Sequence, residues 1–309
     1  MLSLRVAVSN YDRIMALALR DVRADGIELD VHRLPTPEVL ARGDRYEFEV
    51  SEYSMSKYIE ERDHGNNRYQ AIPVFLSRFF RHWSMYVRQD SGITKPEDLR
   101  GKRAGVLNYR YTSSVWTRGI LQHEFGIVAR DLSWIQVEDA SPPNDPHVRL
   151  ETRLGGDLNK MLLEGDVDFI VAPYPPPTMS EPNSPVRRLL PNAGELERNY
   201  YSKTGIFPQM HTLVVQTAVL KEHPWVADSL FTAFQEAKQW AYVHLKGLRV
   251  SLPWLYEQIE EVTVLMGHDH WPYGLDANRS GIDLVVSYLV EQKIIGNRMT
   301  AESLFLNLN

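Results

Sequence analysis

The chain of 309 residues contains no cysteine. Disulfides, thiolate catalysis and metal centres built on cysteine are therefore excluded. Long hydrophobic runs are also missing, because no window approaches the about 20 apolar residues that a membrane-spanning helix needs. The N-terminal stretch MLSLRVAVSNYDR is interrupted early by Arg5 and lacks the apolar run of a signal peptide. These absences predict a location in the cytoplasm.

Basic clusters are scarce as well. The sequence has 34 Lys and Arg against 40 Asp and Glu, a net charge of −6, and no block of Lys and Arg. This composition does not indicate nucleic acid or a membrane as a partner. A small anionic ligand is still compatible with it, because local charge need not follow net charge. The content of 43% hydrophobic and 24% charged residues is typical of a well-packed globular protein.

Strand-like and helix-like segments alternate along the chain. Short apolar runs bounded by turn residues predict strands, and apolar residues three or four positions apart predict helices. The expected strands are 4–10, 26–34, 46–54, 71–76, 83–88, 103–107, 132–139, 168–173 and 210–216. The expected helices are 38–43, 55–65, 96–99, 112–127, 157–165 and 223–245, followed by a mostly helical C-terminus. This alternation predicts an α/β fold with mainly parallel sheets.

The length is sufficient for two such units. The extended segments HWSMYVR (82–88) and FPQMHTLVV (207–215) bracket a middle rich in strand–helix pairs. We therefore expect a discontinuous first lobe from residues 1–87 and 206–309, with a second lobe inserted at residues 88–205. Folds of this kind bind ligands in a cleft, at the C-terminal ends of the strands. The sequence thus predicts an interlobe cleft.

Three charged side chains interrupt the apolar, strand-like run IPVFLSRFFRHWSMYV (72–87): Arg78, Arg81 and His82. Burying an unpaired charge is costly, so these groups either reach water or meet an anion. A guanidinium meets a carboxylate through a planar fork, and an imidazole transfers protons near neutral pH. The alternative is an ordinary interlobe salt bridge with the imidazole hydrogen-bonded in the core.

A family resemblance rests on several blocks that lie in order along nearly the whole chain. They are SNYDRIMAL, GIELD, VSEYSMSKYI, IPVFLSRFFRHWSMYV, GITKPEDLRGKRAGV, TSSVWTRGILQHEFG, TGIFPQMH, HPWVA and LMGHDHWPYGLDANR. In these blocks the chain resembles the 4,5-dihydroxyphthalate decarboxylase family. The resemblance implies a two-lobed, type II periplasmic-binding-protein-like fold and a decarboxylase without a cofactor. It implies a small anionic aromatic substrate and leaves a homo-oligomer open.

Two segments depart from the family pattern. Asn108 and Tyr109 stand where a Glu–Tyr pair is expected, and VAPYPPP (171–177) differs from the usual loop. These departures leave the exact aromatic acid open. A related enzyme for another hydroxylated aromatic acid is therefore one alternative. A cytoplasmic sensor that only binds an aromatic or other small anion is another.

The implied reaction sets chemical requirements. In 4,5-dihydroxyphthalate each carboxylate is para to a hydroxyl group, and direct loss of carbon dioxide would leave an unstable aryl anion. Protonation of the ring carbon that bears the carboxylate, with loss of the para phenolic proton, gives a dienone-like intermediate that expels carbon dioxide. The site then needs a cationic clamp for carboxylate, an acid aimed at the ring carbon and an acceptor for the phenolic proton.

Histidines and arginines near the predicted crossings between lobes are the first candidates. We expect Arg81, and with less support Arg78, to clamp a carboxylate, and His82 beside Arg81 to donate the proton. His211 in TGIFPQMH lies on the return crossing and is the second candidate acid or base. The alternative for His211 is a structural histidine.

Polar residues that follow two strands form a second group. In SNYDR, Asp12 and Arg13 either bind substrate or pair with each other across the turn. In SEYSMS, Glu52 is expected to take the phenolic proton and Ser54 to donate a hydrogen bond to a substrate oxygen. The alternative for Ser54 is capping of the following helix.

The remaining candidates are weaker. Thr112 and Ser113 open a helix whose backbone N–H groups suit an anion, although capping alone explains them. Tyr109 either stacks on the ring or belongs to the core. In GHDHWPYG (267–274), Asp269 is expected to touch substrate. His268 and His270 flank it, but histidines two apart suit one metal only on an extended segment, so no metal is predicted.

Overall fold

The structure is a computed structural model that describes residues 1–247 and 250–308. It contains two compact units, one comprising Met1–Arg78, Gln209–Asp283 and Met299–Asn309, and the other Phe79–Pro208 and Leu284–Arg298. We call them unit 1 and unit 2. Residues 79–87, 206–208 and 284–298, which the sequence pattern assigns to the first lobe, belong to unit 2. The arrangement of two lobes around a cleft stays a prediction.

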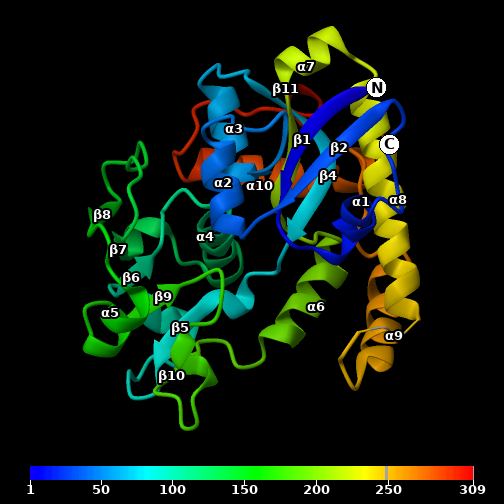
Figure 1. Cartoon of the computed structure of the whole chain (residues 1–309). Helices are drawn as coiled ribbons and strands as arrows, with labels where there is room; N and C mark the ends of the chain where they lie inside the picture. The colour runs from blue at the N-terminus through cyan, green and yellow to red at the C-terminus, as the bar shows by residue number, and fades with distance from the viewer. Residues whose placement is uncertain (248–249, 309) are drawn as a thin grey trace. The chain divides into compact units, whose positions relative to one another are not determined.

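Unit 1 is built on a five-stranded mixed sheet in the order β2-β1-β3-β11-β4 (Figure 1). The strands are β1 (Leu2–Val8), β2 (Ile27–Arg33), β3 (Val50–Ser54), β4 (Tyr69–Arg78) and β11 (Gln209–Gln216). Strand β1 pairs in parallel with β2 and β3, whereas β11 is antiparallel to both β3 and β4. Because β11 lies between β3 and β4, His211 is opposite Ser54 on one side and Ser77 on the other.

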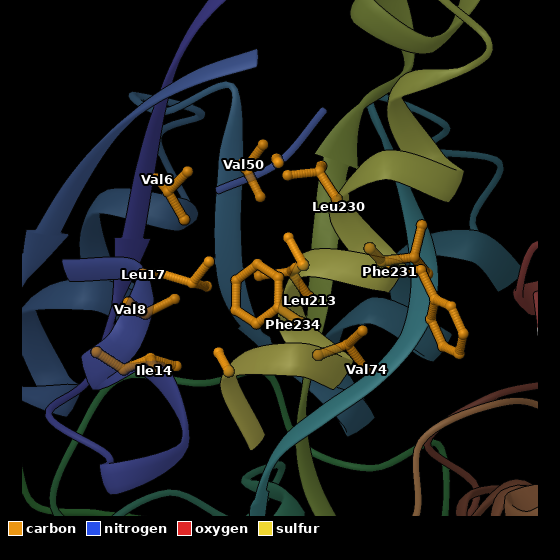
Figure 2. Close-up of a cluster of buried hydrophobic side chains, with 14 of the residues drawn as sticks. Val6, Val8, Ile14, Leu17, Val50, Val74, Leu213, Leu230, Phe231 and Phe234 are labelled. Atoms are coloured by element: carbon orange, nitrogen blue, oxygen red, sulfur yellow. The ribbon is translucent and has the colours of Figure 1, made fainter. Parts of the chain in front are cut away.

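Helices cover both faces of this sheet. The alternation of side chains along β1 sends Val6 and Val8 to one face, where they pack against α1 (Met15–Leu19) and α8 (Val226–Lys246). Figure 2 shows Val6, Val8, Leu213 and Phe234 within this core cluster. Ala7 points to the other face and packs against Val39 of α2 (Thr36–Gly43). Helix α3 (Met55–Asp63) follows β3 directly.

Unit 2 has a six-stranded mixed sheet in the order β10-β5-β9-β6-β7-β8. Its strands are β5 (Met85–Arg88), β6 (Arg103–Val106), β7 (Ser133–Gln136), β8 (Arg149–Thr152), β9 (Phe169–Val171) and β10 (Val186–Arg188). The four strands from β9 to β8 are parallel, and β5 and β10 are antiparallel additions. Its longer helices are α4 (Thr112–Phe125), α5 (Leu158–Glu164) and α6 (Ala193–Thr204).

The remaining helices are short or follow α8. They are α7 (Thr217–Glu222), α9 (Leu255–Met266), α10 (Arg279–Glu291) and α11 (Ala301–Leu304). Single 3-10 turns occur at Asp12–Ile14, His82–Ser84, Pro96–Leu99, Ala129–Asp131, Pro177–Ser180 and Asp276–Asn278. None of the helices in the described part of the chain is both long and apolar enough to cross a membrane.

The predicted α/β class is confirmed. Of two local interpretations of helix caps, the one for α4 is wrong at its N-terminus and the one for α3 holds for the position of Ser54. Helix α4 ends at Gly126, as predicted, with φ at 67°, a conformation that glycine adopts without strain. Its N-cap, however, is Tyr111, whose extended backbone precedes Thr112, so neither Thr112 nor Ser113 is the cap. Ser54 is the N-cap residue of α3, yet its side chain makes no capping hydrogen bond.

Candidate functional site

A buried carboxylate joins three segments of unit 1. Glu52 in β3 is fully buried and accepts hydrogen bonds from the Ser9 N–H at 2.8 Å and the Tyr11 hydroxyl at 2.7 Å. It also lies 2.6 Å from Nδ1 of His211 on the neighbouring strand β11. Three donors thus converge on one carboxylate, which fixes the orientation of both the phenol and the imidazole.

The protonation states in this network follow from these contacts. Burial by itself raises the pKa of Glu52, but the hydrogen bond and charge of His211, with the donors on Tyr11 and Ser9, bring it below the usual value of 4.5. Burial and the neighbouring Glu52 raise the pKa of Tyr11, so the phenol stays protonated. A charged Glu52 holds a proton on Nδ1 of His211 and leaves proton exchange to Nε2.

Arg13 is fixed beside this network. Its guanidinium carbon lies 4.0 Å from the ring centroid of Tyr11 and 4.0 Å from that of Trp271. Its Nε donates to the carbonyl oxygen of Leu76 at 2.9 Å, and its Nη1 pairs with Asp12 at 3.1 Å. Asp12 and Arg13 therefore pair across the turn, as one of the two sequence interpretations expected. The guanidinium is thus held by two aromatic rings, a carbonyl oxygen and a carboxylate.

Arg78 has its partners within unit 1. The side chain is buried, and Nη2 donates to the carbonyl oxygen of Pro272 at 2.7 Å and to Oδ1 of Asn278. Nε2 of Gln209 donates to the same Asn278 oxygen at 3.1 Å. Burial lowers the pKa of Arg78 to about 10, so the group is still charged at neutral pH. These contacts tie the end of β4 to the segment that leads into α10.

Asp269 is engaged by two residues of α8. Its carboxylate accepts from Nζ of the buried Lys238 at 2.8 Å and from the Tyr242 hydroxyl at 2.9 Å. Burial lowers the pKa of Lys238, although the hydrogen bond to Asp269 raises it. Within the described residues, no group of three His, Asp or Glu is placed to hold a metal ion. His268 and His270 therefore do not belong to such a group.

Arg81 and His82 lie in unit 2. Arg81 is buried, its Nη1 donates to the carbonyl oxygen of Pro173 at 3.3 Å, and burial lowers its pKa to about 10. His82 is fully buried, with Nε2 3.1 Å from Glu124 of α4 and its ring 5.5 Å from that of Tyr200. This arrangement is the hydrogen-bonded core imidazole that the sequence analysis held as the alternative.

The other candidates in unit 2 are Tyr109, Thr112 and Ser113. Tyr109 is fully buried and packs its ring edge against Trp134 at 5.5 Å, so it belongs to the core. Thr112 is buried in the first turn of α4, whereas Ser113 is partly exposed. The arrangement of Thr112 and Ser113 as an anion site stays a prediction.

The structure therefore brings together four of the predicted residues in unit 1: Asp12, Arg13, Glu52 and His211. Ser54 is opposite His211 in the sheet, and its hydroxyl lies 3.3 Å from that of Ser56. Sequence reasoning missed Tyr11, although it stands in the block SNYDR between the two strand-end candidates. It also missed Trp271, which was treated only as part of a family block.

Comparison with known structures defines the class. The chain has the periplasmic-binding-protein fold. The periplasmic aliphatic sulphonate binding protein of Escherichia coli aligns over 99% of this chain and 97% of its own, with a TM-score of 0.60 and 12% identity. The alkanesulfonate-binding protein of Xanthomonas axonopodis pv. citri, bound to MOPS, aligns with a TM-score of 0.59 at 11% identity, covering 100% and 99% of the two chains. At these identities the likeness concerns the fold alone.

Comparison with curated sequences is more specific. A 4,5-dihydroxyphthalate decarboxylase of Comamonas testosteroni is 33% identical over 318 residues, which cover 98% of this chain and 96% of the relative. One of Pseudomonas putida is 35% identical over 193 residues, covering 57% of this chain and 72% of the relative. The chain belongs to the 4,5-dihydroxyphthalate decarboxylase family. No protein-family model matches it.

Proposed function

We propose that the protein catalyses the non-oxidative decarboxylation of a dihydroxylated aromatic dicarboxylate. The first candidate substrate is 4,5-dihydroxyphthalate, whose product would be protocatechuate. The observation that carries the proposal is the near full-length relation to decarboxylases at 33% identity. The network of Tyr11, Glu52 and His211 supports it, because it holds an imidazole in one tautomer beside a fixed guanidinium.

The proposed roles follow the chemistry of the ring. Arg13 binds a substrate carboxylate, and Nε2 of His211 exchanges a proton with the substrate. One proton goes to the carbon that bears the leaving carboxylate, and the para phenolic proton leaves. The carbon–carbon bond then breaks, its electron pair restores the aromatic ring, and the resulting phenolate takes up a proton. Glu52 orients His211 and stabilises the imidazolium, which refines its predicted role as the direct acceptor.

The experiment that tests this proposal is incubation with 4,5-dihydroxyphthalate while carbon dioxide and the ultraviolet spectrum are followed. In deuterated water, the ring carbon that lost its carboxylate should carry deuterium. Binding without turnover would favour the second candidate function, a sensor of small anions, which the likeness to binding proteins supports. Neither binding nor turnover would favour a related decarboxylase for another hydroxylated aromatic acid.

Activity is expected to survive exhaustive dialysis against a chelator. The reason is chemical, because a para hydroxyl group supplies the electron density that a Lewis acid would otherwise have to provide. Turnover before and after dialysis is the measurement, with a mock-dialysed sample as the control. Activity that vanishes and returns only with a divalent ion would contradict the expectation. His268, Asp269 and His270 would then be the first candidates for metal ligands.

Arg81→Ala is expected to lower kcat/KM. The loss should correspond to about 2–4 kcal/mol of transition-state stabilisation, the scale of losing a charge-assisted contact. The reason for testing Arg81 is that its guanidinium is buried in unit 2 and donates to a carbonyl oxygen, and that burial lowers its pKa. Arg100→Ala is the control, since Arg100 is half exposed and pairs with Asp131 on the surface of the same unit. Kinetics close to wild type in a folded Arg81→Ala protein would remove Arg81 from the machinery.

A further inference from the structure

Arg118 in the middle of α4 is a buried cation. It is only 3% exposed, and its Nε donates to Oε1 of Gln292 at 2.8 Å. Its guanidinium carbon lies 3.6 Å from the ring centroid of Tyr109, over the face of the ring. Burial lowers the pKa of Arg118 to about 10, so the group keeps its charge at neutral pH. Apart from an interaction with the Tyr109 side chain, neither Nη1 nor Nη2 has a hydrogen-bond partner among the described residues.

This environment differs from those of Arg78 and Arg81, which are also buried. Nη2 of Arg78 donates hydrogen bonds to two oxygens, and Nη1 of Arg81 donates a hydrogen bond to one. The negative charge of Glu197 also acts on Arg81. Burial, Tyr109 and the like charge of Arg110 dominate the charge environment of Arg118 among the described residues. A buried guanidinium with two unsatisfied nitrogens is costly, and an anion that accepts from both would offset that cost.

A cavity of about 250 Å³ lies in unit 2, and Arg118 is separated from it by the residues that line it. Tyr109 and Gln292, the two residues in contact with the Arg118 guanidinium, both line it. The Tyr109 hydroxyl is buried and, apart from its interaction with Arg118, has no hydrogen-bond partner in the described part of the chain. Val128 and Val148 supply apolar wall. The cavity therefore borders the two contacts of Arg118 and has a surface suited to a hydrocarbon body.

The charges around the cavity favour a small anion. Arg130 and Lys293 line it together with Asp145 and Glu291, so the lining by itself is balanced. Glu291 is 2.7 Å from the imidazole of His123, and Asp145 accepts a backbone N–H at 3.0 Å. The buried Arg118 then adds one unpaired positive charge beside a balanced lining.

We propose that unit 2 binds a small monocarboxylate with an apolar body in this cavity. The carboxylate oxygens accept from Nη1 and Nη2 of Arg118 in the bidentate geometry that guanidinium groups favour, and the Tyr109 hydroxyl is a third donor. Because these atoms are covered, entry requires rotation of the Gln292 or Tyr109 side chain. Tyr109, which the sequence analysis considers for stacking on the substrate ring, lines this cavity, whereas Arg13, Glu52 and His211, which have the proposed roles in decarboxylation, do not. The inference therefore goes beyond the proposed function.

The test uses benzoate, with inorganic phosphate as the comparison anion, and follows binding by calorimetry and by the shift in Tm. Wild type is expected to bind benzoate and gain at least ~2 °C at saturation. Arg118→Met is expected to weaken benzoate binding at least ~10-fold. The Tm of this variant without benzoate should match or exceed that of wild type, because an unpaired buried charge is replaced by an apolar side chain. Arg153→Met, at a half-exposed position paired with Glu151, should bind like wild type.

Tyr109→Phe provides a second variant, since it keeps the ring under the guanidinium and removes only the hydroxyl. It should weaken benzoate binding about 3- to 10-fold. The anomalous signal of 4-bromobenzoate in crystals should lie beside Arg118. No benzoate binding by wild type, equal binding by Arg118→Met, tighter binding of phosphate than of benzoate, or bromine found elsewhere would each overturn the proposal. All these readouts measure binding, so they are independent of whether the protein decarboxylates 4,5-dihydroxyphthalate.

Discussion

His211→Asn is expected to lower turnover at least ~10²-fold while the protein still binds substrate, since a positioned acid or base typically contributes ~10²–10⁴-fold. The imidazole lies 2.6 Å from the buried Glu52 through Nδ1 and keeps 14% of its side chain exposed. Asparagine can keep a hydrogen bond to Glu52 but cannot carry a proton to or from the ring. The measurement is steady-state release of carbon dioxide, with substrate binding followed separately by calorimetry.

His123→Asn is the matched control for this loss. His123 lies on α4, is 45% exposed and pairs with Glu291 at the surface of unit 2, so its substitution should change turnover little. Wild-type turnover in His211→Asn would place the acid elsewhere, with Asp12 next to be tested. A loss in both variants would instead indicate that turnover is sensitive to any change in stability.

The same substitution at His82 separates its two interpretations. The sequence analysis predicts a proton donor and hence a similar loss of turnover in His82→Asn. The structure shows a fully buried imidazole that pairs with Glu124, and a purely structural role would lower the Tm and leave turnover intact. Turnover and Tm measured on one sample of the variant decide between these roles.

The pairing of Glu52 with His211 marks the limit of what the sequence could predict. Each residue is a candidate on its own, because each follows or belongs to a recognisable strand. Their contact joins positions 159 residues apart and depends on β11 lying between β3 and β4. Strand order is a long-range property that periodicity does not report. The alternation of strands and helices, by contrast, is local, and the α/β class was therefore predictable.

The charged residues inside the run 72–87 show the same limit. The sequence indicates that Arg78 needs partners, but those partners are oxygens of Pro272 and Asn278, nearly 200 residues further along the chain. The sequence does not indicate that Arg118 is buried, because Arg118 stands in an ordinary helical pattern. Its burial against Tyr109 and the end of α10 appears only in three dimensions. Neutralisation of charge is thus harder to predict from one sequence than the positions of the strands.

Glu52→Gln should lower turnover by about 10²–10⁴-fold, although the side chain keeps its shape. The amide N–H₂ of glutamine is a donor, so it would favour the His211 tautomer that accepts at Nδ1 and carries its proton on Nε2. A neutral His211 in that tautomer cannot accept a proton at Nε2, and its imidazolium form loses the neighbouring negative charge. Substrate binding should change much less than turnover, because Glu52 is fully buried.

Stability against pH provides the second readout for Glu52→Gln. The pKa of Glu52 in the folded protein lies below the usual 4.5, since the donors around it more than offset the effect of burial. A lowered pKa stabilises the fold fully above the pKa of the unfolded chain, and this contribution is lost as the pH falls through the folded value. The Tm of wild type should therefore fall more steeply below about pH 4.5 than that of the variant. Parallel Tm curves from pH 7 to about pH 3, together with unchanged turnover, would mean that Glu52 neither carries the charge nor orients His211 as the hydrogen-bond network indicates.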